Sequence, residues 1–241
     1  MLKVKQAINY KSSDGTMKNT GMLCEVGVVG INLLDYASSF KNMFEGSYID
    51  VENLIISFGN KLDKPIDSNS ALTYMFTNAY GFKKVKIETN TTFSNPMSLI
   101  RLFFLNNADA IPYDVLEEVD LTGIEHIVIS NASSMFNGRK KLKRILGKLD
   151  FSGITVSSTE VFNQCNVLEE VRFKEGTIIV SLSLFQCLSL SKESIQSIID
   201  GLADLTGQTA QTLTFSNVLK DKVTEEQISQ ITSKNWTLTW R

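Results

Sequence analysis

Apolar and polar positions recur in the same order at three places along the chain, in residues 74–87, 134–145 and 160–173. Each stretch has a phenylalanine, a large apolar residue six positions later, and a β-branched residue three positions after that. These positions hold Phe76, Phe82 and Val85, then Phe136, Leu142 and Ile145, and then Phe162, Leu168 and Val171. Internal similarity of this kind is typical of repeat proteins.

Weaker copies extend the pattern over much of the chain. Residues 41–56 align with it when one residue is inserted, which brings Val51, Leu54 and Ile56 into the apolar positions. Residues 184–190 begin a unit and then depart from it. The second half of a unit stands alone at residues 116–121 and 124–129, and residues 99–104 are a further candidate for it.

The end of each unit alternates in the way that strands do, with its last two apolar side chains on one side. One unit cannot bury its own apolar face, but stacked units can share a continuous core. Phe136 and Phe162 are 26 residues apart, within the roughly 20–29 residues of a leucine-rich repeat. Chance recurrence in another α/β protein is the alternative.

The C-terminal segment, residues 191–241, has a different pattern that predicts helix, strand, helix and strand. Apolar residues at 195, 198, 199 and 202 lie on one helical face. Ser191 is the predicted N-cap of that helix and Gly207 its stop. Thr224 and Gln227 form a capping box for a second helix, which Asn235 can end, and strands are expected at 212–215 and 236–240.

We therefore predict an α/β fold: an irregular leucine-rich-repeat solenoid, with short strands stacked into a sheet and short helices or turns on the other side. Its domains are an N-terminal β-rich cap or docking segment (1–36), the repeats (37–190) and an α/β C-terminal cap (191–241). Residues 1–36 fit the repeat poorly, and a polar turn between two apolar stretches indicates a β-hairpin-like start.

The repeat consensus M-F-x-x-C-x-x-L-x-x-V-x-L resembles the BspA-like class of leucine-rich repeats, best within residues 133–190. Cys165 occupies the cysteine position of that class, whereas Ala79 and Arg139 depart from it. Residues 191–241, through the helix ending in Thr-Gly and the stretches TLTF and KNWTL, are similar to C-terminal tails of repeat proteins encoded by phages and mobile elements of gut bacteria. The resemblance implies a binding surface.

Composition narrows the function classes. A net charge of −2 provides no global attraction to nucleic acid or to anionic membranes. No stretch approaches the about 18 consecutive apolar residues of a membrane span, and the first residues lack the apolar core of a signal peptide. Three cysteines, at 24, 165 and 187, do not make a disulfide framework, so we expect the last two to be buried thiols.

The sequence singles out no catalytic, metal or cofactor site, so we predict a protein that is not an enzyme and has no cofactor. His126 is the only histidine and is interpreted as a solvent-facing strand residue. The carboxylate pairs at 117–118 and 169–170 recur at equivalent repeat positions, which indicates a solvated face more than acid–base catalysis. The basic run 138–144 is likewise interpreted as solvated convex surface.

The candidate binding face consists of the outward positions between the last two apolar residues of successive units. These positions hold Lys86, Asp120, Val128 and Arg172. If the strands form one sheet, the four side chains line its outer face, which is the usual binding surface of a solenoid.

Together with the resemblance, these observations favour a structural component of a bacteriophage virion, in the tail or baseplate, that acts in assembly or host attachment. Its expected partners are other virion or surface proteins and host-surface glycan or protein, with a homo-oligomer as a candidate state and without nucleic-acid binding or membrane insertion. Its expected location is the virion, assembled in the host cytoplasm. A bacterial cell-surface adhesin is the alternative, and a carbohydrate-active enzyme is the least favoured.

Overall fold

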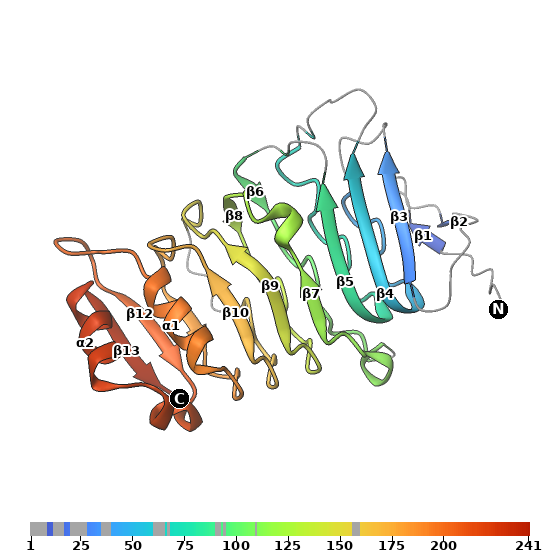
Figure 1. The fold of residues 1–241 in the computed structure, drawn as a ribbon. Coiled ribbons are helices and arrows are strands. Elements are labelled where there is room, and N and C mark those ends of the chain that lie inside the picture. Colours follow the sequence, from blue (N-terminus) through green and yellow to red (C-terminus); the bar gives the residue numbers. More distant parts are fainter. Residues whose placement is uncertain are drawn as a thin grey trace.

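The computed structural model describes residues 9–11, 17–19, 28–34, 40–59, 66, 68–89, 93, 95–108, 110–155 and 160–241. These residues form a mixed α/β fold in which most strands are parallel and helices are few. The strands stand side by side in chain order, so the molecule is elongated across them (Figure 1).

The largest sheet has six strands in the order β10-β9-β7-β5-β4-β3, and all neighbouring pairs are parallel. The strands are β3 (Val28–Leu34), β4 (Tyr48–Gly59), β5 (Tyr80–Thr89), β7 (Glu118–Asp120), β9 (Arg144–Leu149) and β10 (Glu170–Phe173). Because neighbouring parallel strands also follow each other in the chain, every strand requires a return segment behind the sheet.

From β4 to β9 the register of this sheet follows the sequence alignment of the units, whereas the β9–β10 pairing shifts after Glu170, so that Arg172 lies opposite Lys148. Val85, Val119 and Ile145 are direct neighbours on β5, β7 and β9, and all three are buried. The one residue that had to be inserted in unit 41–56 is a bulge in β4. There the pairing shifts so that Val51 lies opposite Phe82, and Leu54 opposite Val85. The predicted alignment of these units is therefore confirmed.

The return segments pack as a second layer, and a stack of phenylalanine rings runs through it. Phe44, Phe76, Phe103, Phe136 and Phe162 follow one another with ring centroids 5.1–5.8 Å apart and with interplanar angles of 4–15°. Backbone N–H groups of one segment donate to carbonyls of the next, for example from Phe44 to Met75 and from Phe76 to Leu102. Apolar stacking and this hydrogen-bond ladder together hold the second layer.

The same backbone conformation recurs in this layer. The residue two positions before each of the first four phenylalanines has a positive φ: Asn42 (61°), Tyr74 (60°), Arg101 (50°) and Ser134 (54°). A non-glycine residue adopts this region only where the surroundings favour it. The conformation thus belongs to the repeat rather than to any one side chain.

Two of the weaker half-units are placed differently from our prediction. Residues 99–104 belong to the second layer, where Phe103 joins the ring stack, and are not a second half that forms a strand. Residues 124–129 overlap a 3-10 turn, η2 (Thr122–Ile124), and lead into the short strand β8 (Ile129–Asn131). β8 pairs with β6 (Met97–Ser98) outside the six-stranded sheet. In both stretches the apolar spacing fits either layer.

The N-terminal hairpin also differs in detail from the prediction. β1 (Asn9–Lys11) pairs antiparallel with β2 (Met17–Asn19). β2 falls within residues 11–21, the polar stretch that was predicted to be a turn. The apolar stretch that follows contributes β3, which pairs parallel with β4. The boundary at residue 36 is therefore not a break in the sheet. The remaining residues of segment 1–36 lie outside the described ones.

The C-terminal segment forms the predicted helix, strand, helix and strand. These are α1 (Lys192–Gly201), β12 (Gln211–Phe215), α2 (Glu225–Ser233) and β13 (Trp236–Trp240), with the 3-10 turn η3 (Asn217–Lys222) before α2. The Ser191 side chain caps α1, and the capping box of Thr224 and Gln227 is present at α2. Gly207 is not the stop of α1, because the helix ends at Gly201.

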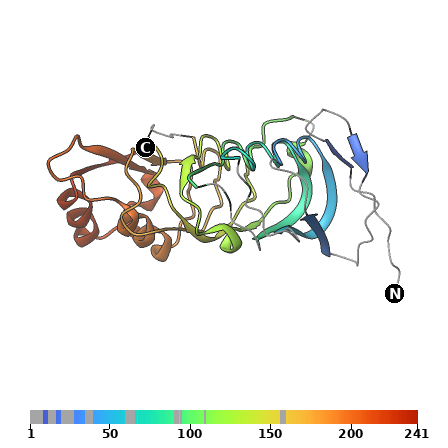
Figure 2. The same ribbon diagram turned by 90° about the horizontal axis from the view of Figure 1, so that it is seen from above.

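The two helices continue the layer of the large sheet, and a small sheet continues the layer of return segments (Figure 2). Strand β11 (Leu182–Leu184) pairs parallel with β12, and β12 pairs parallel with β13. On the other layer, the hydroxyl groups of Ser194 and Ser197 in α1 accept the N–H groups of Val171 and Phe173 in β10. The helix therefore supplies the hydrogen-bond acceptors for these backbone N–H groups at the edge of β10, as a further strand would.

Candidate functional site

Three of the four predicted face residues lie on the outer face of the six-stranded sheet. Lys86 and Asp120 are direct neighbours on β5 and β7. Arg172 lies on β10, opposite Lys148 of β9. The residues on either side of each of the three are buried, so their side chains point away from the core.

Val128 does not join this face. It precedes β8, where its carbonyl accepts the N–H of Met97 and its own N–H donates to the Asn95 side chain. The expectation that Val128 lies on the sheet with the other three is wrong, because the chain turns away at η2 instead of forming a strand there.

Ion pairs organise the outer face. Glu118 of β7 lies between Lys84 of β5, at 3.8 Å, and Arg144 of β9, at 2.5 Å. These two pairs link three neighbouring strands. Their basic side chains are 39–49% exposed, so each pair adds at most about 1 kcal/mol to stability. The pairs mainly fix the orientation of the charges.

Lys86 and Asp120 are neighbours but have other partners. The ammonium group of Lys86 lies 2.7 Å from a Glu88 carboxylate oxygen. This hydrogen bond raises the pKa of Lys86 and lowers that of Glu88. The Asp120 carboxylate accepts the Thr122 N–H and hydroxyl at 2.9 and 2.6 Å, so it closes a local turn. Both residues border a shallow hollow of about 280 Å³ on the face.

A row of three tyrosines, two of them exposed, lies where strands β4 and β5 begin. Tyr48 starts β4 and Tyr80 starts β5, and their ring centroids are 5.2 Å apart. Tyr113, from the 3-10 turn η1 (Ile111–Tyr113), stacks on Tyr80 at 6.0 Å. We call these residues the tyrosine row. Tyr48 is 54% exposed and Tyr113 60%, and the nearby chain also exposes Ile111 and Val115.

Next to the tyrosine row, a second set of charges follows the edge of the sheet. Glu117 pairs with Lys143 at 3.1 Å and with Lys83 at 3.9 Å. The hydrogen bond from Lys143 lowers the pKa of Glu117. Aromatic side chains beside charged ones are typical of surfaces that bind other proteins.

The basic run 138–144 is only partly solvated, because Arg139 is fully buried. Its guanidinium donates to the Asp114 carboxylate at 2.8 Å and to the carbonyls of Phe103 and Ala79 at 2.6 and 2.8 Å. Burial lowers the pKa of Arg139, while the Asp114 carboxylate opposes that effect. Assigning this residue to a solvated convex surface was therefore wrong. It is a core ion pair.

Arg139 occupies the cysteine position of the repeat. In the next units, the Cys165 and Cys187 thiols occupy that position, and each lies near the phenylalanine carbonyl of the unit before, at 3.2 and 3.8 Å. Both cysteines are free and buried, as predicted. Burial raises the pKa of both thiols, which disfavours nucleophilic chemistry.

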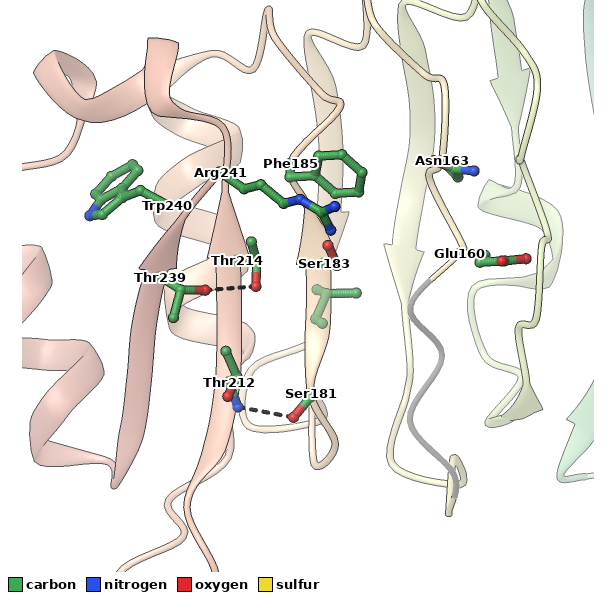
Figure 3. A pocket seen from close by; sticks show the side chains of 11 residues that line it. Glu160, Asn163, Ser181, Ser183, Phe185, Thr212, Thr214, Thr239, Trp240 and Arg241 are labelled. Carbon is green, nitrogen blue, oxygen red and sulfur yellow. Dashed lines mark hydrogen bonds between the residues drawn. The ribbon is translucent and has the colours of Figure 1, made fainter.

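A groove of about 610 Å³ lies over the outer side of the small C-terminal sheet (Figure 3). Its floor is formed by serines and threonines of β12, β13 and the residues in and before β11. Its walls include Phe185 and Arg241 on one side and Glu160 and Asn163 on the other. The residues that line it are Glu160, Asn163, Ser181, Leu182, Ser183, Phe185, Thr212, Thr214, Thr239, Trp240 and Arg241.

Candidate chemistry is sparse in the described part of the chain. His126 is exposed, but it lies in a turn rather than in the predicted strand. Glu117 and Glu169 do occupy equivalent positions in their units. The Lys143 N–H donates to the Glu117 carbonyl, and the Glu169 N–H donates to the Lys143 carbonyl, so the three residues stand at the same place in successive units. No group of three or more histidine, cysteine or acidic residues suited to a metal ion occurs among the described residues.

Among the described helices, none combines the length and apolar character needed to cross a membrane. A scan against protein-family models and searches of the curated proteins and of the solved structures gave no match.

The tyrosine row and the groove were not identified from the sequence, although each has a signal there. Tyr48 and Tyr80 both stand four positions after the phenylalanine of their unit. The signal for the groove floor is a hydroxyl residue at every second position in three short stretches, S-x-S at 181–183 and T-x-T at 212–214 and 237–239. Neither signal specifies a site until the strands that carry it lie side by side.

Proposed function

We propose that this chain is a non-catalytic binding and assembly protein. In this proposal it is an irregular leucine-rich-repeat solenoid with an α/β C-terminal cap. It serves as a bacteriophage virion component, in the tail or baseplate, that is assembled in the host cytoplasm.

Three observations support the solenoid. The aligned apolar residues are neighbours in one parallel sheet, the phenylalanine rings stack from unit to unit, and the positive φ recurs two residues before them. A linear array in which each unit contacts mainly its neighbours is the defining property of solenoid proteins.

The tyrosine row carries the binding function. Exposure of Tyr48 and Tyr113, with Ile111 and Val115 nearby, leaves apolar surface in water, which a protein partner would bury. The neighbouring Lys83–Glu117–Lys143 set would then form the charged rim of that interface. We therefore propose that the tyrosine row and the outer face, including Lys86, Asp120 and Arg172, contact another virion protein or a second copy of this chain.

The virion assignment is supported by the resemblance of residues 191–241 to tails of phage-encoded repeat proteins. It is tested by quantitative mass spectrometry of phage particles purified from a strain that carries the gene. We expect the chain at a fixed copy number per particle. Absence of the chain from intact particles would refute the virion assignment.

The interface is tested in the same particles with the double variant Tyr48→Ser/Tyr113→Ser. The matched control is Val218→Ser, which changes another exposed apolar residue, 63% exposed, in the C-terminal segment. We expect incorporation of the double variant to fall about tenfold or more, because aromatic anchors dominate interfaces. Incorporation equal to that of the control would rule out the tyrosine row as the contact surface.

A further inference from the structure

The C-terminal groove has a floor of hydroxyl groups arranged in two rows across three parallel strands. Ser183 lies opposite Thr214, and Thr214 opposite Thr239. The second row contains Ser181 and Thr212, since the Thr212 N–H donates to the Ser181 hydroxyl at 3.0 Å, while Thr237, the partner of Thr212 on β13, lies outside the lining. We call the five hydroxyl residues that line the groove (Ser181, Ser183, Thr212, Thr214 and Thr239) the hydroxyl array. Alternate residues Leu213 and Phe215 are buried, so the array faces outward.

The backbone ladder of the second layer changes after the Phe162 unit, beside the groove. At this step the Gln164 N–H donates at 2.6 Å to the side chain of Gln186 instead of to a backbone carbonyl. The Phe162 unit and β11 belong to no common sheet. Glu160 and Asn163 form one wall, facing the hydroxyl array.

The opposite wall combines an aromatic ring with a cation. The guanidinium of Arg241 lies 4.6 Å from the ring centroid of Phe185 and extends towards it (Figure 3). The lining thus contains one basic residue, Arg241, and one acidic residue, Glu160. The side chains that line the groove therefore carry no net charge.

We propose that this groove binds an uncharged oligosaccharide that lies across strands β11, β12 and β13. Each hydroxyl has one donor and two acceptor sites. After the 2.8 Å bond between the Thr214 and Thr239 hydroxyls and the 3.5 Å bond from the Thr239 hydroxyl to the Leu213 carbonyl, both groups keep acceptor sites for sugar hydroxyls. The apolar face of a sugar ring can pack on Phe185. The volume of about 610 Å³ is within the roughly 300–1,000 Å³ of small-ligand sites.

Other ligand classes fit the lining less well. A nucleic acid requires several cations against its phosphates, and the groove has Arg241 with Glu160 on the facing wall. A peptide that adds as a strand binds along a sheet edge, whereas the hydroxyl array lies on the face of the sheet. An apolar ligand would strip water from the hydroxyl array without replacing its hydrogen bonds.

The site deepens the proposed function, since it would supply host attachment at the end of the array away from the tyrosine row. Its test uses the full chain on a printed array of neutral and anionic oligosaccharides of bacterial-surface, plant cell-wall and mucin types. The strongest hit is then titrated by calorimetry. We expect neutral oligosaccharides to bind with Kd below about 1 mM. Binding to no neutral glycan, or to anionic glycans alone, would overturn the proposal.

Variants then locate the binding. Thr212→Val/Thr239→Val removes two hydroxyls that line the groove while keeping β-branched strand residues. Thr237→Val is the matched control on the same face, because it is outside the lining. We expect the double variant to weaken binding about 10- to 100-fold, the control to change it less than about twofold, and all variants to melt like the wild type.

Equal glycan affinity in the double variant and the control would place binding elsewhere and overturn the site. The two proposals fail separately. If the particles contain the chain but the chain binds no glycan, the groove proposal alone is refuted. Groove-dependent glycan binding by a chain that is missing from particles would refute the virion assignment alone.

Discussion

Replacing Arg139 by methionine is expected to destabilise the fold by about 3–5 kcal/mol, the usual cost of removing one partner of a buried ion pair. The Asp114 carboxylate would remain in a site where its side chain is 4% exposed. One of its oxygens, Oδ2, is already buried without a hydrogen-bond partner in the structure. The ion pair with Arg139 is thus the main compensation for burying this carboxylate.

The loss extends beyond the ion pair. The guanidinium also donates to the carbonyls of Phe76, Ala79 and Phe103, at 3.3, 2.8 and 2.6 Å. Its hydrogen bonds therefore connect three successive units of the array. Methionine fills much of the space of the arginine stem but donates no hydrogen bond. For a chain of this size, 3–5 kcal/mol corresponds to a fall in Tm of roughly 6–20 °C.

The assay is thermal and urea unfolding followed by circular dichroism, with hydrogen exchange to locate the effect. We expect amides of residues 76–79 and 103–116 to lose most protection in Arg139→Met. Arg139→Cys, which introduces the residue found at the equivalent positions 165 and 187, should be equally destabilising, since a thiol reaches neither Asp114 nor Ala79. Arg139→Met/Asp114→Leu should recover about 1–3 kcal/mol relative to Arg139→Met, because it removes the unpaired carboxylate.

Two results would refute this reasoning. A cost below about 1 kcal/mol for Arg139→Met would mean that the pair contributes no more than a surface ion pair. Additive effects of the substitutions at Arg139 and Asp114 would mean that the two side chains are not energetically coupled.

Three further predictions concern the ring stack, the sheet edge and acid stability. Phe103→Ala, which interrupts the stack between Phe76 and Phe136, should cost about 3–5 kcal/mol in urea unfolding and Phe103→Leu clearly less; equal costs would argue against the stack. Ser197→Ala leaves the Phe173 N–H without its acceptor and should cost about 1–3 kcal/mol, against no measurable change for the exposed Ser233→Ala. Burial opposes ionisation of Asp150, but hydrogen bonds from Ser152 and the ion pair with Lys174 together outweigh it and lower its pKa. Its stabilising effect is therefore present above pH of about 4 and lost on acidification. Asp150→Asn should lower Tm at pH 7 and match the wild type near pH 2, and a difference that persists in acid would contradict this account.

The sequence alone determined the features that depend on local or strictly periodic interactions. The side chains of Ser191 and Thr224 cap helices within three residues of themselves, so their roles could be read without the fold. The aligned apolar positions gave the register of β5, β7 and β9, because one period of the pattern corresponds to one strand. The inserted residue in unit 41–56 was likewise identifiable, and it became the bulge in β4.

Several features could not be assigned because the same apolar spacing occurs in both layers. Residues 99–104 match the end of a unit as well as its beginning, and only the stacking of Phe103 between two other rings decides between them. Val128 was wrongly assigned to the outer face of the sheet because its stretch shows the same ambiguity. Local pattern fixes which side chains are apolar, but it does not fix which layer they join.

Only the tertiary structure decided the environment of Arg139 and the composition of the surfaces. Arg139 stands among lysines in the sequence, yet it is buried, because Asp114, 25 residues earlier, and carbonyls of preceding units satisfy its guanidinium. The tyrosine row and the hydroxyl array likewise combine residues from three different segments. Contacts between units follow from the stacking of strands, whereas a single unit's sequence specifies only its own turn and strand.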